Sequence, residues 1–223
     1  MGTLYLVRHG QASFGAADYD QLSELGARQC QALGHWFAER GITFEAVLRG
    51  TLRRHTQSLA GIAQGFGSHL PAALEWPGLN EYDSHAVVKA VRSEALPKAD
   101  SPEAYREHFR ALRTGLQAWM AGRTQPEGMP SHAEFVAGVN GALDHVRQQH
   151  QGHVLLVSSG GPIATAVGQV LGTSADTTIE MNLRIRNSAL TEFAFTPKRH
   201  MLVSYNHLPH LDHAERRGWE TYS

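Results

Sequence analysis

The sequence predicts an α/β protein: a three-layer α/β/α sandwich with a mostly parallel central sheet. Two observations predict this fold. Apolar runs rich in strand formers, such as residues 4–7 and 154–157, are short and lack a polar face, which is typical of buried parallel strands. Longer segments with apolar residues at helical spacing separate these runs. Such alternation of strands and helices favours helices on both faces of one sheet.

The elements follow one another without repeats. Ser23 can cap a first helix, which Gly41 ends. Residues 44–48 form a second apolar strand, and residues 50–58 turn into a second helix. The later elements are a short extended piece and loop at 74–81, an amphipathic helix through Tyr105 and Trp119, a helix at 133–149, a strand at 154–157, a helix opened by Gly160-Gly161-Pro162, and two alternating strands at 189–195 and 201–205.

Composition bounds the possible functions. The chain has 223 residues, of which 42% are hydrophobic and 18% are charged, so we expect one globular domain over residues 1–223, with a helical cap or insertion at about 82–131. The net charge of −1 gives no reason to expect nucleic acid or an anionic membrane as a partner.

The same data suggest a compartment. Cys30 is the single cysteine, which fits a reducing environment, and the first strand begins almost at Met1, where a signal peptide would stand. Residues 154–175 carry no charge, but Ser158-Ser159-Gly160-Gly161-Pro162 breaks the run, so it reads as strand, turn and helix and not as a membrane span. We therefore expect a cytoplasmic protein.

Reactive side chains follow the strand ends. The first strand leads into Arg8-His9-Gly10, where an imidazole can attack phosphorus and a guanidinium can hold phosphate oxygens. Arg53 and Arg54 open the second helix, Glu81 follows the third extended piece, and residues 158–161 form a glycine-rich turn after a further strand. Carboxyl ends of parallel strands meet at one edge of a sheet, so these groups predict a site for phosphoryl transfer.

The residues resemble those of a known family, the histidine phosphatase superfamily, also called phosphoglycerate-mutase-like. Residues 6–10, Leu-Val-Arg-His-Gly, match its opening signature, and 22–26, Leu-Ser-Glu-Leu-Gly, look like its Leu-Thr-x-x-Gly helix start. Residues 52–58 are similar to its Leu-x-Arg-Ala-x-Gln-Thr segment, and 79–81 to the segment with the proton donor. Two weaker matches, 186–188 and 206–211, are similar to elements near its carboxyl end.

The resemblance implies a metal-independent, cofactor-free phosphatase that hydrolyses phosphomonoesters in two steps. His9 would form a phosphohistidine, Glu81 would act first as acid and then as base, and Arg8 and Arg54, not Arg53, would hold the transferring group. It also implies five substrate-binding residues: Gly10, Gln11, Ser159, Gly160 and Asn187. The expected partner is a small phosphorylated substrate or a phosphoprotein, and the expected state is a monomer or homodimer.

Two departures from the family pattern leave alternatives open. Ser159 stands where the family usually has a second histidine, so a phosphate-binding protein with weakened catalysis is one alternative; His55 is a candidate substitute for that histidine. Residues 82–86 read Tyr-Asp-Ser-His-Ala where mutases of the family tend to have Gly-x-Trp-Glu-Gly, which weighs against a phosphoglycerate-type phosphomutase.

Two further readings are set aside. His207, His210 and His213 have a spacing that could bind a metal on a helix, but Pro209 argues against a regular helix there. Ser159 on a strand-to-helix turn suggests a serine hydrolase, but Val157 stands where a nucleophile elbow needs glycine.

Overall fold

The computed structural model describes residues 1–13, 20–92, 94, 96, 97 and 101–222. Within these residues the chain forms one sheet with six strands: β1 (Gly2–Arg8), β2 (Phe44–Arg49), β3 (Ala73–Glu75), β4 (His153–Ser158), β5 (Leu190–Thr196) and β6 (Arg199–His207). Seven α-helices surround it in the described part: α1 (Glu24–Glu39), α2 (Arg53–Phe66), α3 (Ser84–Lys89), α4 (Pro102–Met120), α5 (His132–Gln149), α6 (Gly160–Leu171) and α7 (Ala175–Arg184).

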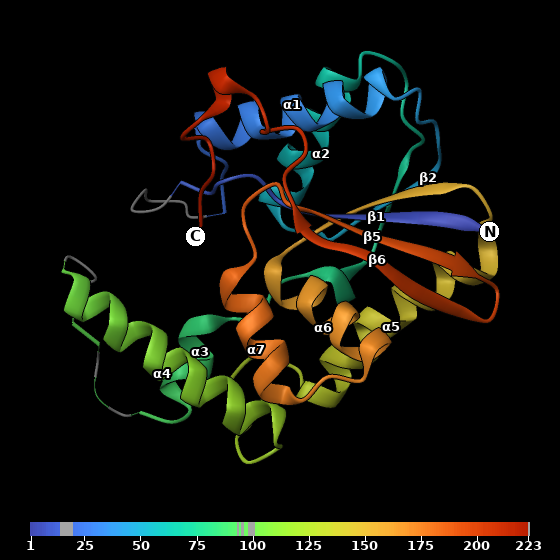
Figure 1. Cartoon of the computed structure of the whole chain (residues 1–223). Coiled ribbons are helices and arrows are strands. Elements are labelled where there is room, and N and C mark those ends of the chain that lie inside the picture. Colours follow the sequence, from blue (N-terminus) through green and yellow to red (C-terminus); the bar gives the residue numbers. More distant parts are fainter. Residues whose placement is uncertain (14–19, 93, 95, 98–100, 223) are drawn as a thin grey trace.

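The predicted fold class is confirmed. The strand order is β3-β2-β4-β1-β5-β6. Figure 1 labels four of these strands, β2, β1, β5 and β6. Strands β3, β2, β4 and β1 are parallel, β5 pairs antiparallel with β1, and β6 pairs antiparallel with β5. The carboxyl ends of the parallel strands therefore meet at one edge, as the sequence predicts.

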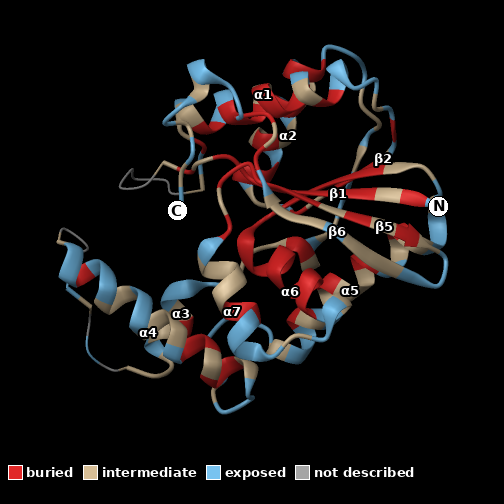
Figure 2. Cartoon of the chain, viewed as in Figure 1, coloured by how far each residue is buried: buried red, intermediate tan, exposed pale blue. Residues whose placement is uncertain are grey.

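Residues of β1 show why the molecule has three layers. Leu4 and Leu6 join a hydrophobic core that includes residues of α5 and α6, whereas Tyr5 and Val7 join a second core with residues of α1. Since successive side chains of a strand point to opposite faces, the sheet is covered on both sides. Figure 2 shows that α6 and the middle of the sheet are buried, while the outer part of α4 is largely exposed.

Two helices were not predicted. Helix α7 has Ser174 as its N-cap, whose side chain accepts a hydrogen bond from the amide of Thr177, and α3 is capped in the same way by Asp83. Both helices are short, so the apolar periodicity that predicts longer helices is weak in them. The segment at about 82–131 was expected to be the least regular, and it contains α3 and the predicted helix α4.

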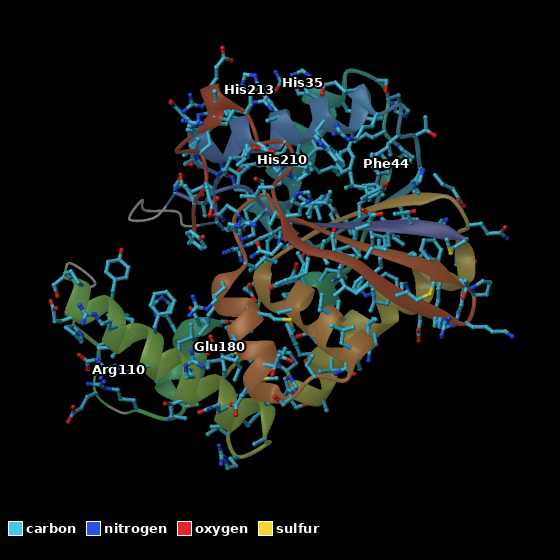
Figure 3. The ribbon with its side chains drawn as sticks, viewed as in Figure 1. His35, Phe44, Arg110, Glu180, His210 and His213 are labelled. Carbon is cyan, nitrogen blue, oxygen red and sulfur yellow. The ribbon has the colours of Figure 1, made fainter. Side chains whose placement is uncertain are left out.

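Helix α4 packs against α3 and α7. Arg113 forms an ion pair with Glu180 of α7, which Figure 3 labels beside α4. The side-chain amide Nε2 of Gln117 donates to Asp176 Oδ1 over 2.8 Å. That this region acts as a cap or insertion stays a prediction. Among the described residues, no helix combines the length and the apolar character needed to cross a membrane.

Candidate active site

The reactive edge is built by three neighbouring strand ends. Arg8 of β1 pairs with Ser158 of β4, and the amide of His9 donates to the Ser158 carbonyl over 2.9 Å. The amide of Gly50, just after β2, donates to the Val157 carbonyl over 3.1 Å. These backbone bonds continue the sheet for one residue beyond each strand and so fix where the following side chains begin.

His9 is a buried, neutral imidazole. Its Nδ1 lies 2.7 Å from the carbonyl oxygen of Gly10, and only 3% of the residue is exposed. A carbonyl oxygen can only accept, so Nδ1 carries the proton and Nε2 keeps a free lone pair. Burial, followed by the positive charges of Arg8 and Arg54, holds the pKa of His9 well below its ordinary value. The ring is therefore suited to be a nucleophile.

The loop after β1 lies directly against α1. A Cβ at Gly10 would come within 2.4 Å of the Gly26 carbonyl oxygen, so no larger residue fits there. The amide of Gly10 donates to Ser58 Oγ over 3.0 Å, and the amide of Gln11 donates to Gln29 Oε1 over 2.9 Å. Both predicted substrate-binding residues thus have their backbone donors engaged within the protein, where they shape the loop that carries His9.

Two guanidinium groups lie near His9. Arg54, in the first turn of α2, is buried, and its Nη1 donates to Asp20 Oδ1 over 2.7 Å. The second oxygen of Asp20 accepts from the amide of Arg53, whose own side chain is exposed. Arg8 is 9% exposed and its Nη1 donates to the Ile185 carbonyl. These bonds fix both cations before any ligand arrives, as expected of a preorganised anion site.

Glu81 supplies the carboxyl group. Its Oε2 accepts from the amide of Gly161, at the start of α6, over 3.1 Å, and its Oε1 accepts from the amide of Tyr82 over 3.2 Å. Burial raises the pKa of Glu81, against the opposing effects of the Gly161 amide and of Arg54 and Arg8. A raised pKa is what a proton donor near neutral pH requires.

Ser159 and His55 form a pair beneath His9. Ser159 Oγ lies 2.7 Å from His55 Nε2, and both residues are completely buried. The rings of His9 and His55 have centroids 6.0 Å apart. Burial and the charges of Arg54 and Arg49 lower the pKa of His55 to about 3, so this imidazole is neutral at physiological pH. The neighbouring hydroxyl of Ser158 donates to the Leu79 carbonyl over 2.6 Å, away from the pair.

The last two predicted substrate-binding residues contact other parts of the protein. Asn187 is buried, and its Oδ1 accepts from Thr221 Oγ1 over 3.0 Å. A Cβ at Gly160 would lie 2.8 Å from Asn182 Oδ1 and 2.9 Å from the Ile185 side chain, so glycine permits a close approach there.

Several residues that support the site were given no role on the basis of the sequence. Asp20 holds Arg54, Ser58 holds the amide of Gly10, and Gln29 links Gln11 to the carbonyl of Trp219 over 2.6 Å. Ser58 lies in the 52–58 segment that resembles the family, but no local pattern encodes the three contacts, because each joins segments that are far apart along the chain.

The described residues include no group of three His, Cys, Asp or Glu that could hold a metal ion. The nitrogen Nε2 of His210 lies 2.9 Å from Ser188 Oγ. A cavity of about 980 Å³ beside α4 is lined by residues such as Arg92, Glu107 and Arg110 and by none of the groups around His9.

Comparisons with known proteins identify the class of protein to which the chain belongs. A profile of the histidine phosphatase superfamily (branch 1) matches residues 4–208. The fold and the sequence match agree, and the chain belongs to this superfamily. No curated protein matches the sequence.

Solved structures share the fold at low sequence identity. A phosphoserine phosphatase from Entamoeba histolytica is 18% identical, with 95% of this chain and 100% of that chain covered and a TM-score of 0.61. A phosphoglycerate mutase from Bacillus anthracis is 18% identical, with 94% of each chain covered and a TM-score of 0.64. An α-ribazole phosphatase from Shigella flexneri is 18% identical, with 92% of this chain and 96% of that chain covered and a TM-score of 0.62.

Proposed function

We propose that the protein is a metal-independent phosphatase that hydrolyses phosphomonoesters through a phosphohistidine on His9. One observation carries the proposal: His9 Nδ1 is hydrogen-bonded to the Gly10 carbonyl oxygen, so the lone pair of Nε2 is available beside the buried cations Arg8 and Arg54. Two fixed positive charges can neutralise a phosphate dianion and let a neutral nucleophile approach it.

The first step forms a bond from His9 Nε2 to phosphorus and breaks the ester P–O bond. Glu81, whose pKa is raised by burial, acts in its protonated form and gives the proton to the leaving oxygen, which departs as the alcohol. In the second step a water attacks the phosphohistidine and passes a proton to the Glu81 carboxylate. The N–P bond breaks, inorganic phosphate leaves, and both residues return to their starting states.

We propose a small phosphorylated metabolite as the substrate, with a phosphoprotein as the wider possibility. Structural relatives named for phosphoserine and α-ribazole substrates support a small ester. Gly10, Gln11, Ser159, Gly160 and Asn187 would then form the walls of the phosphate pocket. The single cysteine is buried and free, which supports our proposal that the protein acts in the cytoplasm.

A second candidate is a phosphate-binding protein with weak turnover. The neutral pair of Ser159 and His55 favours it, because this pair adds no positive charge to stabilise the transition state. Tight binding of vanadate or phosphate together with very slow hydrolysis would distinguish it from the phosphatase.

The test is a panel of phosphomonoesters assayed with and without a metal chelator, followed by trapping of the phosphohistidine intermediate. We expect hydrolysis in the chelator, inhibition by vanadate, and transfer of ³²P from a labelled ester to His9 in samples quenched under alkaline conditions. His9→Ala should lower turnover by at least about 10³-fold, as loss of a nucleophile does in comparable enzymes. Analysis of the products separates hydrolysis from a mutase, which would return the phosphoryl group to a second position.

The matched control is His35→Ala, which removes an exposed histidine on α1. It should behave as the parent protein. Full turnover in His9→Ala, or activity that one particular metal ion restores after chelation, would contradict the proposal.

A further inference from the structure

Ser159 stands at the N-cap of α6 but does not cap it. Its side chain makes no hydrogen bond to the helix terminus, although serine is one of the preferred capping residues. An N-cap hydroxyl accepts from the second or third amide of the helix. In α6 the third residue is Pro162, which has no N–H, so Gly161 offers the one amide that Ser159 could take.

Glu81 occupies that amide. Its Oε2 accepts from the Gly161 N–H over 3.1 Å, and a Cβ at Gly161 would lie 2.1 Å from Glu81 Oε1. The carboxyl group therefore lies directly against the helix terminus, and the absence of a side chain at Gly161 permits this approach. Ser159 and Glu81 are competitors for a single N–H donor.

His55 decides this competition. Its Nε2 lies 2.7 Å from Ser159 Oγ, and its Nδ1 is buried with no hydrogen-bond partner among the described residues. The Nδ1 atom faces Gly50, where an added Cβ would come within 2.2 Å of it. The bond between Nε2 and Ser159 Oγ is therefore the one hydrogen bond of the His55 ring among the described residues, and it holds the hydroxyl whichever of the two groups donates it.

We propose that His55 is a positioning residue for the proton donor: by holding the Ser159 hydroxyl it keeps the Gly161 amide free for Glu81. The inference rests on the proposed phosphatase function, since Glu81 is the acid of that reaction. It gives Ser159 a role that requires no contact with phosphate. In the absence of His55 the buried hydroxyl would turn to the Gly161 amide and displace the carboxyl group from the leaving oxygen.

The experiment uses four variants of the full chain. His55→Phe keeps a ring and removes the one hydrogen bond that His55 makes to Ser159. His55→Gln keeps a side-chain group that can either donate a hydrogen bond to Ser159 or accept one from it. Ser159→Ala removes the competing hydroxyl, and the double variant His55→Phe/Ser159→Ala removes both groups. His35→Phe, on the exposed face of α1, is the matched control, and His55→Leu replaces His55→Phe if the latter does not fold.

The reactivity of the ester separates positioning from a general loss of structure. Esters with a good leaving group need little protonation, whereas alkyl esters need the acid. In His55→Phe we expect kcat for an alkyl ester to fall about tenfold or more, part of the full effect of losing a general acid, with KM little changed and aryl esters less affected. The double variant should be more active on alkyl esters than His55→Phe, and His55→Gln should regain most of the activity.

A structural measurement distinguishes this inference from the proposed function. Crystals of His55→Phe should show Ser159 Oγ on the Gly161 amide and Glu81 turned away, whether or not the protein is a phosphatase. Glu81 unmoved in these crystals would overturn the inference, as would equal losses for alkyl and aryl esters or a double variant no better than His55→Phe. If the parent protein hydrolyses no ester, the proposed function fails while the crystals still decide the role of His55.

Discussion

The two halves of the site are held in different ways. In the cationic half, formed by Arg8, His9 and Arg54, the guanidinium groups donate to a fixed carbonyl oxygen and a carboxylate, those of Ile185 and Asp20. In the acidic half, formed by Glu81 and Gly161, one carboxyl group accepts hydrogen bonds from two backbone amides. The cations are fixed by partners of opposite charge or dipole, whereas the acid is placed where burial governs its protonation.

The difference shows how one pocket can contain a base-like and an acid-like group. Burial lowers the pKa of His9 and raises the pKa of Glu81, because in both cases it disfavours the charged form. The same physical effect therefore favours a neutral nucleophile and the protonated form of the acid. Pairs of titratable groups whose pKa values move in opposite directions are typical of acid–base active sites.

The largest expected effect comes from removing the proton donor of the acidic half, Glu81. Glu81→Gln keeps the size of the side chain and an acceptor for the Gly161 amide but cannot give a proton. We expect kcat for an alkyl ester to fall about 10²–10⁴-fold, the usual range for a lost general acid. Steady-state kinetics with alkyl and aryl esters measure this, and the aryl esters should lose less.

The pH profile supplies the control for this variant. In the parent protein the rate of phosphoryl transfer to His9 should fall as pH rises through the raised pKa of Glu81, because the proton donor is lost. That limb should be absent in Glu81→Gln. A variant that retains the limb would show that another group titrates there and that the acidic half is misassigned.

The cationic half was the more predictable from sequence. Arg8 and His9 are neighbours in the chain at the end of an apolar run, so their placement follows from that strand, and alignment with the family chose Arg54 over Arg53. In the structure Arg54 is buried and the side chain of Arg53 is exposed, and the role of Arg54 in the pocket stays a prediction. The long-range partner Asp20 could not be predicted, because the contact depends on how the loop before α1 returns to α2.

The acidic half depends on contacts that no local pattern encodes. Glu81 was predicted from the segment it resembles, but its bond to Gly161 joins residues 80 positions apart. The pairing of His55 with Ser159 spans 104 positions, although His55 had been suggested as a substitute for a missing histidine. The alternation of strands and helices and the three layers, in contrast, follow from short apolar runs and the helical segments between them, whereas the strand order was not predicted.

A second, smaller effect tests the assignment of Arg54 to the cationic half. Arg54→Gln removes a charge that would hold the transferring phosphoryl group, and we expect kcat/KM to fall about 10²–10³-fold, as for loss of one donor in an oxyanion site. Arg53→Gln is the matched control, since the side chain of Arg53 is next to Arg54 in the sequence but is exposed. Substitutions on the surface usually change the free energy of unfolding by no more than about 0.5 kcal/mol. Equal losses in the two variants would contradict the assignment of Arg54 to the pocket.

The smallest expected effect concerns the support of the cationic half. Ser188 donates its amide to the carbonyl of His9 over 3.0 Å, and its Oγ lies 2.9 Å from Nε2 of His210. Burial, with the charges of Arg216 and His207, lowers the pKa of His210 to about 3. Figure 3 labels His210 between α1 and the sheet, and labels His35 out on α1, where the residue is exposed.

Acid should therefore weaken the fold behind His9. Between pH 6.5 and about 3 the unfolded chain binds a proton on His210 that the folded protein does not, so stability rises with pH in this window and falls on acidification. From pH 7 to pH 5 this histidine should contribute a loss of about 2 kcal/mol, from the ordinary histidine pKa and about 1.4 kcal/mol per pH unit. Urea unfolding at each pH measures the loss. His210→Gln, which keeps a donor for Ser188, should lose about that much less than the parent, while His35→Gln should match the parent. If His210→Gln and the parent lose stability equally, His210 is not held neutral in the folded protein, and the support of the cationic half does not depend on it.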